Sequence, residues 1–195
     1  MAKNLRRPQV RVTRALPRRI ALTGTPGTGK SSVVALGGTA VQWTEVYAIA
    51  RSHGAARRRR TGWEIDLRRL SHAMRRDRPV GTEVIVGHLA HLLPVQGAIV
   101  LRCRPEELYR RLTRARRGSP KDRRENALAE ALGIVASEVR DSGIPWVEID
   151  TTDRSAASVA RSVLARLRHI PPRPLRPIDW LGDADVAEHL LDWSR

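Results

Sequence analysis

The amino-acid sequence predicts an α/β fold in three layers, in which a five-stranded, mostly parallel sheet lies between helices on both faces. Two observations support this prediction. Short apolar runs alternate along the chain with stretches of helical periodicity, and a glycine-rich motif joins the first apolar run to the first helical stretch. At 195 residues, the chain is long enough for one domain with a substantial core.

Five apolar runs have the length and composition of buried parallel strands. They cover residues 19–24, 39–43, 82–87, 98–103 and 145–150. Because consecutive parallel strands need a crossover connection, we expect the stretches between them to form helices.

The intervening stretches carry the signals of helix starts and ends. Gly37 should end the first helix after about two turns, whereas Thr44 caps the second helix and Gly54 ends it. Pro105 stands at a favourable first-turn position with two carboxylates behind it. The expected helices cover residues 31–36, 44–54, 63–77, 105–112 and 155–167.

A further long helix is expected after residues 114–120. Apolar residues recur there at intervals of three and four, which is the helical period. These residues are Leu128, Leu132, Val135 and Val139.

The chain divides into three parts by composition. Residues 1–18 form a basic arm in which two prolines prevent a long helix. Residues 19–168 contain all the expected strands and form the domain. Residues 169–195 begin with a proline-rich linker and continue as an acidic and aromatic tail.

The chain is strongly basic, with a formal net charge of +16, as in proteins that bind nucleic acid. A GC-rich coding sequence explains the arginine excess equally well, because lysine is rare and phenylalanine is absent. The clusters Arg57–Arg60 and Arg114–Arg117 are more specific candidates for RNA contact. No apolar run approaches the roughly 18 residues of a membrane span. We therefore expect a cytoplasmic monomer or weak oligomer without membrane partners.

The stretch from Gly24 to Ser31 fits the phosphate-binding pattern G-x-x-x-x-G-K-[ST], between an expected strand and an expected helix. Its glycines allow a tight turn that points N–H groups inward, and the helix start attracts anions. Lys30 supplies a compact charge for the nucleotide phosphates, where the planar fork of arginine does not fit. Ser31 can offer its hydroxyl to Mg²⁺. The motif therefore predicts a Mg·ATP site in a P-loop NTPase fold.

Three later segments follow the P-loop in order: residues 87–94, 100–112 and 116–132. Together with the P-loop they resemble the adenylate kinase isoenzyme 6 family, archaeal and eukaryotic kinases that are also linked to maturation of the small ribosomal subunit. The resemblance covers residues 20–167. It implies a nucleoside monophosphate (NMP) insert over about residues 43–66 and a short lid over about residues 116–125.

The resemblance also implies an activity. A broad-specificity NMP kinase of this family transfers the γ-phosphoryl group of ATP, with Mg²⁺, to AMP or another NMP, and it has ATPase activity. The implied partners are a small-subunit ribosomal protein and pre-rRNA, with a role in rRNA processing and ribosome biogenesis.

Site residues follow from the same resemblance. Lys30, His88 and Arg117 match the catalytic positions, with Arg117 in the lid and His88 after the third strand. The residues that match those holding ATP phosphates are Gly27, Gly29, Lys30, Ser31, Ser32 and Arg117, with Ser31 also at the metal. A helix motif is matched by Glu125, Asn126 and Glu130.

One position departs from the family pattern. The family has Asp-x-His where this chain has Val86-Gly87-His88, and that aspartate helps to hold Mg²⁺. Asp150 or Asp66 are candidate replacements. The loss of such a partner typically costs about 10- to 100-fold in metal affinity or activity. The alternatives to a kinase are therefore a nucleotide-switched ribosome assembly or RNA-binding factor, and a P-loop protein that has lost catalysis.

Overall fold

The structure is a computed structural model that describes residues 18–39, 41–59, 62–171, 177–186 and 188. The predicted basic arm, apart from Arg18, and much of the predicted tail lie outside the described residues. Within the described part, every helix is too short or too polar to cross a bilayer.

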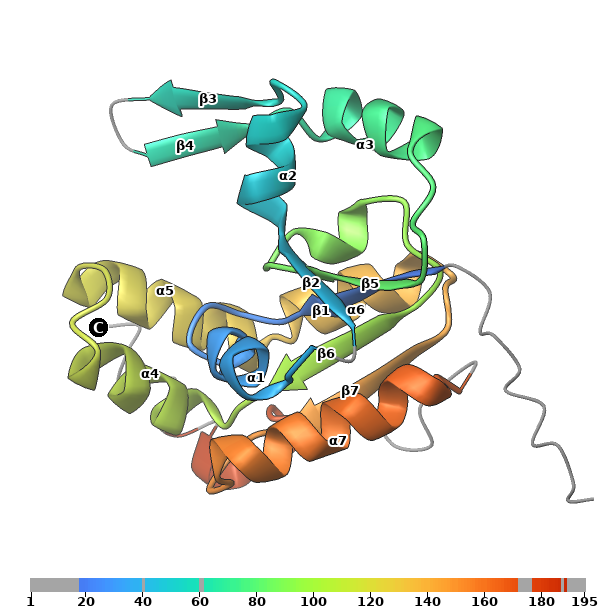
Figure 1. The fold of residues 1–195 in the computed structure, drawn as a ribbon. Coiled ribbons are helices and arrows are strands. Elements are labelled where there is room, and N and C mark those ends of the chain that lie inside the picture. Colours follow the sequence, from blue (N-terminus) through green and yellow to red (C-terminus); the bar gives the residue numbers. More distant parts are fainter. Residues whose placement is uncertain (1–17, 40, 60–61, 172–176, 187, 189–195) are drawn as a thin grey trace, which may run out of the picture.

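A five-stranded sheet forms the centre of the molecule, in the order β2-β5-β1-β6-β7, and every adjacent pair is parallel (Figure 1). The predicted fold class is therefore confirmed, and each strand overlaps a predicted apolar run. The strands are β1 (Arg18–Thr23), β2 (Gln42–Glu45), β5 (Thr82–Val86), β6 (Ala98–Arg102) and β7 (Trp146–Asp150).

Helices cover both faces of this sheet. Helices α1 (Lys30–Leu36) and α7 (Ala156–Arg168) pack on one face, where Val33 and Val163 join Leu22 in an apolar cluster. The other face packs against α2 (Val46–Ser52), α3 (Leu67–Arg76), the short 3-10 helix η1 (Ala90–Leu92) and α6 (Ile134–Asp141). Both faces of the sheet are therefore buried, and the loops that follow the strands lie at its carboxyl edge.

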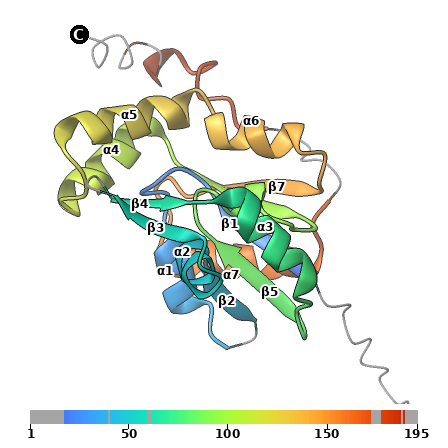
Figure 2. The ribbon, with the colours of Figure 1, turned by 90° about the horizontal axis from the view of Figure 1, so that it is seen from above.

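Helices α4 (Pro105–Arg114) and α5 (Pro120–Ala131) lie side by side (Figures 1 and 2). The predicted single long helix after residue 120 is wrong, because α5 ends at Ala131 and α6 begins at Ile134. Gly133 between them has a φ of 63°, in the left-handed region, which interrupts the helix. The apolar period continues through this break, which is why it suggested one helix.

A β-hairpin of β3 (Ala56–Arg59) and β4 (Gly62–Ile65) stands apart from the main sheet. The prediction of a helix from residue 63 is wrong at its start, because Asp66 caps α3 and its side chain accepts a hydrogen bond from the Arg69 N–H. Hairpin residues Ala56 and Ile65 pair with each other and pack against the core below.

Candidate functional site

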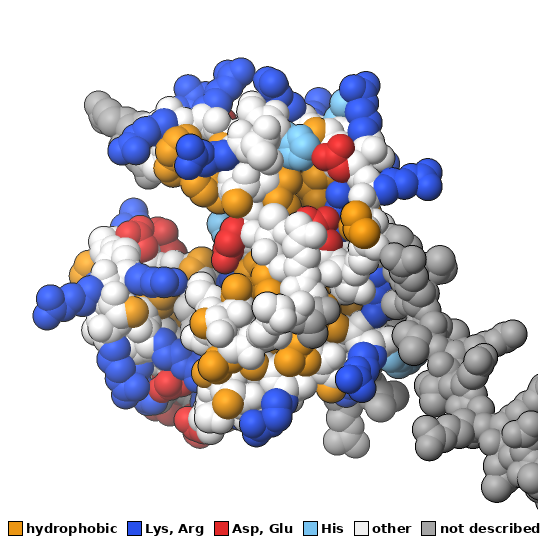
Figure 3. Space-filling view, viewed as in Figure 1, with side chains coloured by type: hydrophobic (Ala, Val, Ile, Leu, Met, Phe, Trp, Pro, Cys, Tyr) orange, Lys and Arg blue, Asp and Glu red, His pale blue; other side chains and the backbone are white. Residues whose placement is uncertain are grey.

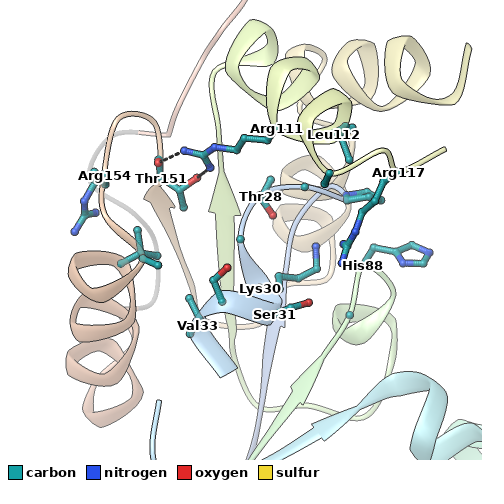
Figure 4. Close-up of a pocket in the computed structure, with 18 of the residues that line it drawn as sticks. Thr28, Lys30, Ser31, Val33, His88, Arg111, Leu112, Arg117, Thr151 and Arg154 are labelled. Atoms are coloured by element: carbon teal, nitrogen blue, oxygen red, sulfur yellow. Dashed lines mark hydrogen bonds between the residues drawn. The ribbon is translucent and has the colours of Figure 1, made fainter. Parts of the chain in front are cut away.

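A cavity of about 580 Å³ opens beside the loop between β1 and α1 (Figure 4). Its volume lies in the range of small-molecule sites. The loop, the residues after β5, the end of α4 and the β7–α7 connection contribute to its lining. Every predicted catalytic or phosphate-binding residue lines this cavity: Gly27, Gly29, Lys30, Ser31, Ser32, His88 and Arg117.

The backbone of the loop needs glycine at two of these positions. Gly27 has a φ of 96°, and a Cβ atom there would lie 2.8 Å from a methyl group of Leu108 and 3.0 Å from one of Leu112. Gly29 has a φ of 103° and precedes the first turn of α1. Side chains at either position would strain the turn, so the glycines fix the path of the loop beneath α4.

Lys30 is held by the loop itself. Its Nζ donates hydrogen bonds to the carbonyl oxygens of Gly24, at 2.6 Å, and Thr25, at 3.0 Å. Burial lowers the pKa of Lys30 to about 8, and the charge of Arg117 acts in the same direction, whereas Glu130 and Glu45 oppose it. An anion bound here would favour the charged ammonium group, so the site is suited to phosphate.

His88 and Arg117 reach the cavity from separate elements. His88 follows β5, and Arg117 lies between α4 and α5, where its N–H donates to the carbonyl oxygen of Leu112 at 3.0 Å. Figure 4 shows both side chains on the same side of the loop as Lys30. Burial lowers the pKa of His88, and the charge of Lys30 lowers it further, which favours a neutral imidazole at pH 7.

Glu45 is an acidic residue of the cavity that the sequence reasoning missed. It is the last residue of β2, and burial raises its pKa while Lys30 lowers it. The expected replacements for an acid at Val86 have other contacts. Asp66 caps α3, and Asp150 accepts a hydrogen bond from the Thr152 N–H at 2.8 Å. A signal for Glu45 existed, since ligands of parallel sheets bind at the carboxyl ends of strands.

The far end of the cavity contains two arginines that the sequence reasoning also missed. Arg111 of α4 donates to Thr151 twice, to its Oγ1 at 3.0 Å and its carbonyl oxygen at 2.7 Å (Figure 4). Arg154 donates to the carbonyl oxygen of Asp150 at 3.1 Å. The contacts of Arg111 join α4 to the β7–α7 connection, and Figure 4 shows Arg111, Thr151 and Arg154 at the end of the cavity away from His88.

The helix motif of α5 contributes little to the cavity. Asn126 donates to the carbonyl oxygen of Asp122 within its own helix, and Glu125 lies 3.9 Å from Lys121 in an exposed pair. Glu130 is instead buried, with its carboxylate accepting a hydrogen bond from Thr25 of the loop.

The side-chain oxygen atoms near Lys30 are suitable ligands for a magnesium ion that arrives with a nucleotide. Mg²⁺ usually keeps several waters and takes one or two protein groups together with substrate phosphates. Ser31 and Glu45 offer a hydroxyl and a carboxylate in the cavity. A group of three or more His, Cys, Asp or Glu side chains placed to hold a metal is absent from the described residues.

Comparison with known proteins gives relatives along most of the chain. The protein named "Putative adenylate kinase" of Archaeoglobus fulgidus is 38% identical over 171 residues, which cover 85% of this chain and 93% of the relative. Its namesake in Halobacterium salinarum is 40% identical over 157 residues, covering 76% and 89%. This chain belongs to the same adenylate kinase family. The sequence profile described as "AAA domain" also matches residues 20–133 of this adenylate kinase family member.

Solved structures agree on the fold of this family member. Shikimate kinase from Acinetobacter baumannii, in complex with shikimate, superposes with a TM-score of 0.52 at 17% identity, covering 80% of this chain and 94% of that one. Shikimate kinase from Bacteroides thetaiotaomicron gives a TM-score of 0.50, also at 17% identity, over 78% and 99%. These likenesses confirm the arrangement of a parallel sheet between two layers of helices.

Proposed function

We propose that this protein is a broad-specificity NMP kinase that transfers the γ-phosphoryl group of ATP to AMP or another NMP. One observation carries the proposal: Lys30, Glu45, His88 and Arg117 come from four separate parts of the chain and line one cavity beside the P-loop. Phosphoryl transfer needs alignment and charge neutralisation more than covalent chemistry from the protein. A cavity lined by four cationic side chains, an imidazole and a carboxylate supplies both.

Each residue has a distinct task in this proposal. The loop amides at Gly27 and Gly29, with Lys30 and Ser32, bind the ATP phosphates. Arg117 neutralises charge on the phosphoryl group as it moves, and His88 hydrogen-bonds to the phosphates or the acceptor. The nucleoside of ATP occupies the far end of the cavity, where Arg111, Thr151 and Arg154 lie.

Magnesium, when bound, neutralises charge between the β- and γ-phosphates. Ser31 would hold it directly and Glu45 would hold its water shell. In this proposal Glu45 replaces the acid that the family carries at the position of Val86. The same nucleotide site would hydrolyse ATP slowly without an acceptor, so the proposal includes a weak ATPase activity.

A coupled assay of purified protein tests the proposal. ADP formation from ATP should depend on AMP, and Lys30→Ala should abolish it because the phosphates lose their ammonium partner. Arg117→Ala should lower kcat by about 10³-fold, as expected for an arginine that acts on the transferring group. Arg114→Ala is the matched control, since Arg114 is exposed and does not line the cavity. Absence of AMP-dependent turnover at high enzyme concentration would reject the kinase activity.

The β3–β4 hairpin favours a second function, RNA binding in small-subunit ribosome maturation, as in the isoenzyme 6 branch. Its described arginines, Arg57, Arg58 and Arg59, are exposed; Arg60 lies outside the described residues. The Arg58 guanidinium lies 5.8 Å from the ring centroid of Trp63, which is also half-exposed. Basic side chains gather over this part of the surface in Figure 3. Arginines beside an exposed aromatic ring are suited to phosphates and unstacked bases.

Binding of RNA over a salt series tests this second function. A protein that neutralises phosphates loses affinity steeply as salt rises, and replacing Arg57, Arg58 and Arg59 with alanine should flatten that slope. The matched control replaces three exposed arginines of α3, Arg68, Arg75 and Arg76. An equal slope in both variants would mean that the hairpin makes no specific RNA contact.

A further inference from the structure

The buried carboxylate of Glu130 joins parts of the chain that are far apart in sequence. One oxygen accepts a hydrogen bond from Thr25 of the P-loop. The other accepts from Arg102 Nε at 2.7 Å, the Cys103 N–H at 3.1 Å and the Trp180 indole N–H at 3.3 Å. Glu130 itself is only 1% exposed.

A buried carboxylate is costly unless it is paired and fully hydrogen-bonded, and the donors around Glu130 meet that requirement. They also connect it to the nucleotide site. Thr25, which donates to Glu130, offers its carbonyl oxygen to Lys30 Nζ at 3.0 Å. Glu130 is therefore linked to Lys30 through one intervening residue, Thr25. It holds the half of the P-loop that follows β1. Its charge also raises the pKa of Lys30.

The C-terminal segment, residues 177–186, supplies one of these donors. Ile178 anchors the segment: its N–H donates to Glu148 Oε2 at 3.0 Å, and its carbonyl oxygen accepts from Arg102 Nη1 at 3.2 Å. Figure 2 shows the segment, in red, beside the junction of α5 and α6. Trp180 thereby places its indole N–H on Glu130, so the segment belongs to the support of the site.

Glu130 also lies at one end of a helix whose other end leads to the cavity. α5 begins with a capping box at Ser119, two residues after Arg117, and Glu130 occupies its last turn. A helix fixed at Glu130 holds the position of the loop that carries Arg117. One carboxylate thus contacts the P-loop and the helix that follows the predicted lid.

We propose that Glu130 is a positioning residue for the P-loop and that Trp180 of the C-terminal segment completes its hydrogen bonding. Its kinetic consequence rests on the proposed kinase activity, but its effect on ATP binding does not. Replacing Glu130 directly would leave Arg102 buried with one partner fewer and destabilise the fold. The test therefore removes the donors of Glu130.

The experiment compares the Kd for Mg·ATP, by calorimetry, and the melting temperature of four variants with those of the full-length protein. Thr25→Val removes the hydroxyl and should raise the Kd about tenfold, as for a lost hydrogen bond to a charged group. Thr25→Ser keeps the hydroxyl, so its Kd should stay near that of the original protein. Trp180→Phe should raise the Kd about threefold, since its hydrogen bond is longer and acts through Glu130.

Trp43→Phe is the matched control, because it removes an indole hydrogen bond to Gly38 that has no contact with Glu130. It should leave the Kd unchanged. In kinetics, Thr25→Val should raise the KM for ATP and leave the KM for AMP as it is, whereas general destabilisation would not separate them. Equal Kd values for the Thr25→Val and Thr25→Ser variants would overturn the proposal. Calorimetry gives this result even if the original protein fails to phosphorylate AMP.

Discussion

Glu45 at the end of β2 lies directly beside Val86 at the end of β5, as register partners in the parallel sheet. A carboxylate on one strand thus stands next to the position where a family acid is replaced by valine on the neighbouring strand. Val86 is buried in the apolar layer and does not line the cavity, whereas Glu45 does. In the proposed function, Glu45 takes the part of that acid from the neighbouring strand.

Glu45→Gln should therefore weaken the use of magnesium. We expect turnover at limiting Mg²⁺ to fall about 10- to 100-fold, the usual effect of losing an outer partner of a metal. A high concentration of Mg²⁺ should restore part of the lost turnover. Titration of Mg²⁺ at fixed ATP measures the effect, and Glu64→Gln in the exposed hairpin is the control. An unchanged Mg²⁺ requirement would assign Glu45 no part in metal binding.

Gly27→Ala should damage the loop through contact with α4. The added methyl group meets Leu108 and Leu112 at about 3 Å in a backbone region that disfavours alanine, so we expect a loss of about 1–3 kcal/mol in the free energy of unfolding. ATP affinity should fall as well. Gly143→Ala is the control, because Gly143 also has a positive φ but a Cβ atom there would meet open space. Chemical denaturation should show a smaller loss of stability for this variant, and calorimetry should show normal ATP binding.

Cys103 should be unreactive in the folded protein. Burial raises the pKa of its thiol to about 12, and the residue is fully enclosed beside Leu108. Since the thiolate is the reacting species, a disulfide reagent at pH 8 should label it more than about 10³ times slower than an ordinary cysteine. Denaturant should restore fast labelling. Rapid labelling of the native protein would show that α4 opens readily from the core.

The stability of the fold should decrease as the pH falls through about 6.5. His91 lies between Thr23 Oγ1, at 3.0 Å, and Glu138 Oε2, at 2.9 Å, and burial lowers its pKa in spite of Glu138. The folded state keeps the ring neutral while the unfolded chain takes up a proton. Unfolding therefore becomes easier toward low pH, by at most about 1.4 kcal/mol per pH unit for each histidine.

His91→Gln should reduce this slope, which denaturation between pH 7.5 and 5.5 would measure. His88, whose pKa is also lowered, contributes with the same sign, whereas the raised pKa values of Glu45 and Glu148 act in the opposite direction. A variant with the original slope would place the pH dependence elsewhere.

The main sheet was predictable because parallel strands that are buried on both faces have continuous apolar sequences. The β3–β4 hairpin was not, since its strands contain arginines and derive their stability from partners. Trp63 packs edge-to-face on Tyr47, with ring centroids 4.9 Å apart, and Arg59 pairs with Glu64. Such contacts have no period along the chain.

The candidate site also contains residues that the sequence could predict and residues that only the fold reveals. The P-loop is contiguous, so its residues are visible as a motif, whereas Glu45 reads as the start of a helix and is seen beside Lys30 only when β2 joins the sheet. Arg111 is one of many arginines, and only the fold brings it to Thr151, 40 positions away in the sequence. Arg154 is close to Thr151 in the sequence, but only the fold places it in the cavity with Arg111. The Thr25–Glu130 hydrogen bond spans 105 positions of sequence, beyond any local pattern.

That separation has a consequence for folding. Contacts between distant segments form slowly, because the chain must close a long loop before it gains the contact. Thr25, Glu130 and Trp180 meet only when almost the whole described domain is in place. In a refolding experiment the capacity to capture nucleotide should therefore appear together with the native core, so that incomplete chains do not sequester ATP.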